Sequence, residues 1–130
     1  MKVRNSIVVI GAVAALAVAL PAVAHHSFPA TYRVDQKQTI SGTVAGFLFR
    51  NPHSFVHIMA PDKAGKMQRW AVEWSAGAAL SSQGVSAASL KVGDKVTVVG
   101  NPARSEADHR LRMNKIERPK DGWKWEGNVE

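Results

Sequence analysis

The residues of this chain with the clearest chemical potential are its histidines, two of which stand side by side. The sequence holds five histidines and no cysteine, and His25 and His26 come directly after an apolar leader. If the chain is cut between Ala24 and His25, His25 carries a free amine and an imidazole, which together can chelate one metal ion. His26 adds a neighbouring imidazole, and nitrogen-rich, roughly planar ligand sets suit Cu(II). The sequence therefore predicts a copper site at the mature N-terminus.

A further ligand for this copper site must come from elsewhere in the chain. His53, His57 or His109 could complete the set if the N-terminal arm folds back, and we assign His53 as the third metal-binding residue. The arrangement resembles the histidine brace of several exported copper proteins. A copper enzyme of the oxygenase type would need an open brace that faces a substrate, and no residue pattern here indicates one. The competing interpretation is that the paired histidines follow a cleavage site without binding a metal.

The first 24 residues have the three parts of a cleavable secretory signal peptide. Lys2 and Arg4 make the start positive, residues 7–20 form an apolar run of 14 residues, and alanines at 22 and 24 give an A-x-A end. A membrane-spanning helix would need roughly 20 apolar residues. We therefore expect a signal helix within residues 1–24, a mature chain starting at His25, and a periplasmic or secreted protein. The membrane is then a partner only through the signal peptide before cleavage.

His53 and His57 have the H-x-x-x-H spacing that lets two imidazoles on one helix share a zinc ion. Here the stretch follows Pro52 and is rich in Phe, Val and Ile, which indicates a strand. In a strand the two histidines would lie roughly 13 Å apart. The glutamate of the metalloprotease motif is also missing. We therefore exclude a zinc site that uses both histidines.

The pairing of this strand with the next one defines a second candidate site. A slip of one residue would turn every side chain to the other face, so we choose the register that sets apolar residues opposite each other: Ala60–Gln68, Ile58–Trp70 and Val56–Val72. The other face then carries Phe55, His57 and Glu73, together with His53. An aromatic ring, imidazoles and a carboxylate on one face suit a small polar ligand. The competing interpretations are that the histidines are ordinary half-exposed strand residues and that Glu73 pairs with a nearby Arg or Lys.

The elements that would position these residues form an all-β domain. After an N-terminal arm over residues 25–38, apolar and β-branched segments over residues 39–120 predict five strands, with one short helix between the third and the fourth. This order is typical of a small five-stranded OB-like β-barrel, although other small barrels fit nearly as well. The expected strands lie at 39–49, 54–60, 67–75, 91–100 and 110–118, and the helix lies within 76–90. Residues 121–130 read as a C-terminal tail, in which Trp123 and Trp125 either stack on a ligand or cover a barrel edge.

Four short motifs carry a resemblance to a known family. They are "AHHSF" after the leader, "NPH", "WAVE" and "SLKVGDKVTVVG", in this order along nearly the whole mature chain. On these motifs the sequence resembles a family of small exported bacterial proteins of unknown function. The resemblance implies an exported, β-rich single domain and supplies no activity, so the function must be argued from the site residues.

Composition and motifs narrow the classes of function. The formal net charge is +7, but the basic residues are spread along the chain, and export makes nucleic acid an unexpected partner. A cysteine nucleophile, a G-x-S-x-G elbow, a Walker loop and a dinucleotide fingerprint are all missing from the sequence. The leading hypothesis is therefore an exported, non-catalytic protein that binds copper. The alternative is a metal-free module that binds a small polar ligand, a glycan or a protein of the cell envelope.

Overall fold

The computed structural model describes residues 27–129. The expected signal peptide, its cleavage site, His25 and His26 lie outside the described residues. The described elements are, in chain order, α1 (Phe28–Thr31), β1 (Gln38–Leu48), β2 (Phe55–Pro61), β3 (Met67–Glu73), α2 (Gly77–Ser82), β4 (Lys95–Pro102), the 3-10 helix η1 (Glu106–Asp108), β5 (Arg110–Arg118) and β6 (Trp123–Glu126). Within residues 27–129, none of the helices is long and apolar enough to cross a membrane.

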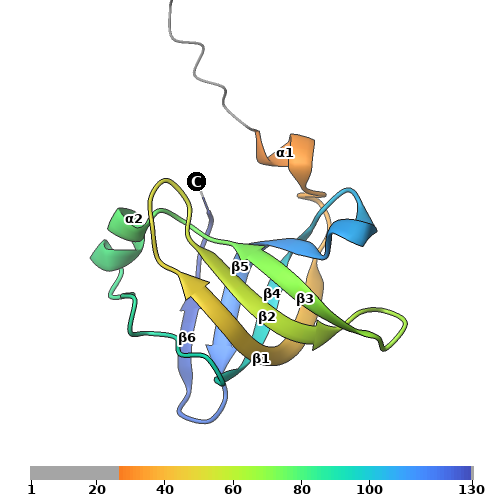
Figure 1. Ribbon diagram of the computed structural model, residues 1–130. Coiled ribbons are helices and arrows are strands. Elements are labelled where there is room, and N and C mark those ends of the chain that lie inside the picture. Colours follow the sequence, from red (N-terminus) through yellow and green to blue (C-terminus); the bar gives the residue numbers. More distant parts are fainter. Residues whose placement is uncertain (1–26, 130) are drawn as a thin grey trace, which may run out of the picture.

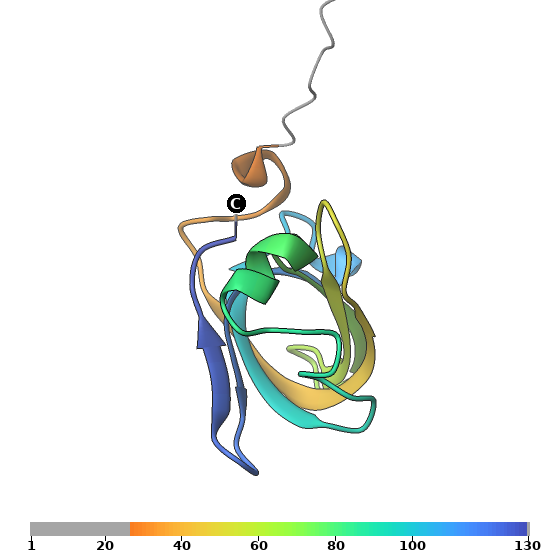
Figure 2. The same cartoon turned by 90° about the vertical axis from the view of Figure 1, so that its left-hand side faces the viewer.

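Five of the strands close into a barrel (Figure 1). The sheet runs in the order β3-β2-β1-β4-β5-β6, and a parallel pairing between β3 and β5 closes the ring. Figure 2 looks into this ring, with α2 over the near end, whereas the β2–β3 turn lies at the opposite end. The predicted all-β fold, a small five-stranded barrel with one short helix between the third and fourth strands, is confirmed.

Glycines in β1 allow the strand to bend around the barrel. The register between β1 and β2 shifts between Val44 and Gly46, which is the β-bulge that a glycine within a strand pattern indicates. At Gly42 an added Cβ would overlap the carbonyl oxygen of Met59 on β2. The close approach of the two backbones therefore requires glycine at position 42.

The predicted register between β2 and β3 is confirmed. Ile58 pairs with Trp70 and Val56 with Val72, and all four side chains belong to the core. Trp74, which continues the same alternation, is fully buried. Because Val56, Ile58 and their partners point inward, the intervening residues of both strands point outward, which places Phe55 opposite Glu73.

Two segments hold more structure than the sequence indicated. In the N-terminal arm, α1 precedes Tyr32, which is 1% exposed and forms a bridge with Ala103. Near the C-terminus, β6 pairs with β5, and the Trp125 ring lies edge-on to Trp74 at 5.1 Å between ring centroids. Of the two alternatives for this tryptophan, covering the barrel is therefore the one that the structure shows. The predicted short helix within 76–90 is confirmed as α2, which ends before Gly84, whose φ of 81° favours glycine.

Candidate functional site

A buried carboxylate at the end of β3 joins three separate parts of the chain. Glu73 is 9% exposed. Its Oε2 accepts a hydrogen bond from the Tyr32 hydroxyl, and Arg110 Nη2 donates to the same oxygen at 3.0 Å. Its other oxygen, Oε1, lies 3.4 Å from Nδ1 of His53. The arm, β5 and the β1–β2 loop therefore meet at one side chain, and we call these four residues (Tyr32, His53, Glu73 and Arg110) the Glu73 cluster.

The strand pairings explain how distant residues reach this point. The parallel pairing of β3 with β5 sets Ala71 beside Arg110, so the Arg110 side chain extends along the outer face toward Glu73. His53 lies two residues before β2, in a loop that Ser54 holds in place. The Ser54 hydroxyl donates to the Arg50 carbonyl at 3.1 Å, and its backbone N–H donates to the Ser75 carbonyl at 3.0 Å. The loop therefore keeps His53 beside the end of β3.

The short helix α1 covers the Glu73 cluster. The Phe28 ring lies edge-on to the His53 ring at 6.0 Å between centroids, and the Arg112 guanidinium packs over Phe28 at 4.1 Å. Between α1 and the barrel is a cavity of about 290 Å³, which we call the α1 cavity. Its lining residues are Phe28, Thr31, Tyr32, His53, Glu73 and Arg110.

The arm that carries α1 is tied to the β4–β5 loop. The backbone N–H of Arg104 donates to the Thr31 carbonyl at 3.0 Å, and Arg104 Nε donates to the Pro29 carbonyl at 2.7 Å. The N–H of Arg33 donates to the Pro102 carbonyl at 2.8 Å. These bonds hold α1 in place beside the α1 cavity.

The electrostatics of the cluster favour a protonated tyrosine. Burial raises the pKa of Tyr32, and the hydrogen bond to Glu73 and the charge of that carboxylate raise it further. The Tyr32 hydroxyl therefore remains a donor at every physiological pH. With Tyr32 and Arg110 both donating to Oε2, the carboxylate is held in a fixed orientation, with Oε1 directed to His53.

His53 lies with one of its ring nitrogens beside the Glu73 carboxylate. Its Nδ1 is buried and makes no hydrogen bond to a described residue, and Glu73 Oε1 lies 3.4 Å from it, whereas the side chain as a whole is 33% exposed. Ligating histidines commonly direct their second ring nitrogen to a carboxylate, which fixes the ring and raises its basicity. His53 can therefore offer Nε2 to a ligand in the α1 cavity while Glu73 orients the ring.

The other predicted ligand-binding residues lie apart from this cavity. The Phe55 ring has the Arg50 guanidinium at 5.5 Å and the Arg110 guanidinium at 5.4 Å, so cations pack against it. His57 lies further along β2, and its pKa is lowered by burial and then by the charges of Arg69 and Arg50. Neither residue lines the α1 cavity.

His109, the third histidine considered as a metal ligand, follows η1. Its ring lies edge-on to Trp70 at 5.2 Å between centroids, and it lines a different cavity from His53. The structure therefore brings together His53 and Glu73 from the predicted set, and separates them from His57 and His109. Within the described residues, no group of three or more His, Cys, Asp or Glu side chains could hold a metal ion.

The residues that sequence reasoning missed are Tyr32, Arg110 and Phe28. Tyr32 and Phe28 lie in a polar arm without periodicity, so no pattern pointed to their burial. The interpretation that Glu73 pairs with an arginine is correct, since Arg110 is its partner. Arg110 reaches Glu73 through the parallel pairing of β3 with β5, which no local pattern in the sequence indicates.

Comparisons with known proteins bear on the family of the chain. Residues 12–112 match the model of a family of unknown function (DUF6152). The search of curated proteins and the search of solved structures each gave no match.

Proposed function

The chain belongs to this family of unknown function (DUF6152), and we propose that it is an exported, non-catalytic binding protein that takes one Cu(II) ion. The proposed ligands are the amine and imidazole of His25 at the mature N-terminus, with His26 beside them. His53 is the ligand that the barrel contributes. The order of the strands and the helix between β3 and β4 also lead us to class the barrel as OB-like.

The observation that carries this proposal is the contact between Phe28 and His53. Their ring centroids are 6.0 Å apart. His25 is three residues before Phe28 in the sequence, so at most about 11 Å of extended chain separates the two Cα atoms. A cut after Ala24 therefore creates a chelating terminus within reach of an imidazole that points into the α1 cavity. His57 and His109 do not line this cavity.

Glu73 acts in this proposal as a positioning residue for His53. Oε2 already accepts bonds from Tyr32 and Arg110, and Oε1 is beside the buried Nδ1 of His53. A carboxylate in this place holds the imidazole with Nε2 toward the cavity. The same network explains why a carboxylate is buried on this face of the barrel.

The pH dependence of the proposed site follows from its ligands. The α-amine of His25 has an ordinary pKa near 8, and both the amine and the imidazoles must be unprotonated to bind a metal ion. Copper affinity therefore weakens as the pH falls from 8 toward 5. Copper binding of this kind suits storage, delivery or an accessory role in electron transfer in the periplasm or outside the cell.

Single histidine variants test the role of His53. Copper affinity is measured by calorimetry at matched pH on the exported chain and on His53→Ala, His57→Ala and His109→Ala. We expect His53→Ala to lower the affinity by at least about tenfold, the size of effect that loss of one ligand-orienting contact already gives. His57→Ala and His109→Ala are matched controls on the same domain and should leave the affinity unchanged. Equal loss in all three variants would mean non-specific histidine binding, and no loss in His53→Ala would remove it from the site.

The second candidate function is a metal-free module for a small ligand or an envelope protein. A second cavity, at the end of the barrel opposite α2, favours the small ligand. An exported protein that keeps its leader uncut would favour this candidate over copper, because His25 would then have no free amine.

A further inference from the structure

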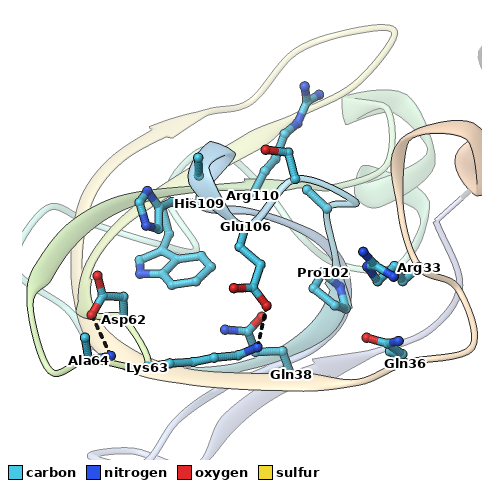
Figure 3. Close-up of a pocket in the computed structure, with 14 residues that line it drawn as sticks. Arg33, Gln36, Gln38, Asp62, Lys63, Ala64, Pro102, Glu106, His109 and Arg110 are labelled. Carbon is cyan, nitrogen blue, oxygen red and sulfur yellow. Dashed lines mark hydrogen bonds and ion pairs between the residues drawn. The ribbon is translucent and has the colours of Figure 1, made fainter.

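A second cavity lies at the end of the barrel opposite α2, and we call it the barrel mouth. It has a volume of about 300 Å³ and lies between the β2–β3 turn, η1 and the start of β1 (Figure 3). Arg110 touches both cavities, but its side chain leads away from the barrel mouth toward Glu73. Mouths of β-barrels are among the places where small-molecule sites most often occur.

The inner wall of the barrel mouth is apolar. Trp70 is 4% exposed, and its Nε1 donates to the carbonyl of Ala60 at 3.1 Å. The polar atom of the indole is therefore satisfied, and the surface that Trp70 offers to the cavity is apolar. Pro102 and Ala103 extend this wall. The wall suits the apolar body of a ligand.

The rim of the barrel mouth holds a carboxylate between cations. Glu106 of η1 and Lys63 of the β2–β3 turn meet at 2.8 Å between Oε1 and Nζ, and Figure 3 shows the two side chains joined at the cavity. The bond to Lys63, with a smaller effect of Arg33, lowers the pKa of Glu106. Glu106 is therefore ionised at neutral pH and pairs with the Lys63 cation at the cavity.

The other carboxylate at the rim is already occupied. Asp62 Oδ1 accepts the backbone N–H groups of Ala64 and Lys66 at 2.9 Å, and Oδ2 accepts from Gln68 at 3.1 Å. Asp62 therefore shapes the turn, and Glu106 is the carboxylate that Lys63 holds. The Glu106 carboxylate forms the ion pair with Lys63 that the carboxylate of a bound ligand would form.

We propose that the barrel mouth binds a small organic carboxylate, whose anionic group replaces Glu106 on Lys63 and whose apolar body packs on Trp70 and Pro102. The Lys63 and Glu106 side chains are 73% and 77% exposed, and ion pairs as exposed as this contribute little to stability. Exchanging one carboxylate for another on Lys63 therefore costs little. The ligand gains the burial of its apolar body, which Glu106 does not provide. This site uses neither His25 nor a metal ion.

Benzoate and its uncharged analogue benzamide test the proposal. The exported chain, labelled with ¹⁵N, is titrated with each compound, and dissociation constants are taken from amide shifts of residues 62–64 and 105–109. We expect benzoate to bind more tightly than benzamide. Glu106→Gln removes the internal competitor and should tighten benzoate binding by about two- to fivefold, with no change for benzamide. Lys63→Met should weaken benzoate binding by a similar factor.

The pair Lys115–Glu117 on β5 supplies matched controls, because it is also a lysine–glutamate ion pair, with 2.7 Å between Nζ and Oε1, and does not line the barrel mouth. Lys115→Met and Glu117→Gln should leave both dissociation constants unchanged. Three results would overturn the proposal: no benzoate shifts at these amides, equal binding of benzamide and benzoate, or benzoate binding that Glu106→Gln does not tighten.

Discussion

Replacing Tyr32 by Phe tests whether the hydroxyl bond to Glu73 holds the N-terminal arm on the barrel. The ring of Tyr32 is buried at 1% exposure, and Phe keeps this packing while it removes one donor to a buried carboxylate. A hydrogen bond to a charged group contributes about 1.5–3 kcal/mol. Because Arg110 still donates to the same oxygen, we expect a loss in the lower part of that range, about 2 kcal/mol.

Unfolding in urea, followed by tryptophan fluorescence, measures this loss, and a domain of this size should melt about 10 °C lower. Ser41→Ala is the control, because it removes an exposed side-chain bond to Thr97 and should change stability by less than about 0.5 kcal/mol. A Tyr32→Phe variant as stable as the Ser41→Ala variant would show that the hydroxyl bond to Glu73 does not hold the arm on the barrel.

The pH dependence gives a second test of the same bond. The pKa of Tyr32 is raised by burial and by Glu73, so it is higher in the folded protein than in the unfolded chain. The contribution of Tyr32 to stability is therefore complete below the ordinary pKa near 10 and is lost as the pH rises further. Because the chain has one tyrosine, tyrosinate absorbance reports on Tyr32 alone. We expect no tyrosinate near pH 10 in the folded protein and ordinary titration in urea; equal titration in both would contradict the buried bond.

Two further predictions concern the barrel wall. Trp125→Ala should destabilise the domain by about 3–5 kcal/mol, because the ring packs on Trp74 and its Nε1 donates to Gln83 at 2.6 Å. The same change at the half-buried Trp123 should destabilise the domain less. Equal urea midpoints for the two variants would contradict this packing. His57 should titrate below its ordinary pKa near 6.5 in NMR spectra, because burial and then Arg69 and Arg50 disfavour its charged form. Arg69→Gln should raise that pKa in part, and a His57 pKa above 6.5 in the unmodified chain would show that its surroundings are not as described.

The part of the fold that was predictable from sequence depends on strict alternation. Val56, Ile58, Trp70 and Val72 alternate with polar or half-buried residues along their strands, and this alternation indicated which side chains point inward and which outward. It also placed Glu73 on the outer face, near His53. Alternation is a local property, and it therefore predicts the content of a strand and its nearest partner well.

The features that the sequence did not predict depend on contacts between segments that are far apart in the chain. Tyr32 and Glu73 are 41 positions apart, and the arm around Tyr32 has no period that would indicate burial. Arg110 reaches Glu73 only because β3 and β5 pair in parallel when the barrel closes. β6 has only four residues, and its sequence alone is compatible with a loop. It forms a strand because it pairs with the edge of β5. Closure of the barrel depends on pairing between strands that are far apart in the sequence, so no local sequence pattern predicts it.

Native mass spectrometry of the protein produced from the full sequence, with added Cu(II), tests the proposed copper site. We expect a chain that begins at His25 and retains one copper ion, and a variant with one extra residue before His25 that loses copper at the same concentration. Copper retention that is equal in the two chains, or an exported protein that keeps residues before His25, would contradict a copper site built on the mature N-terminus.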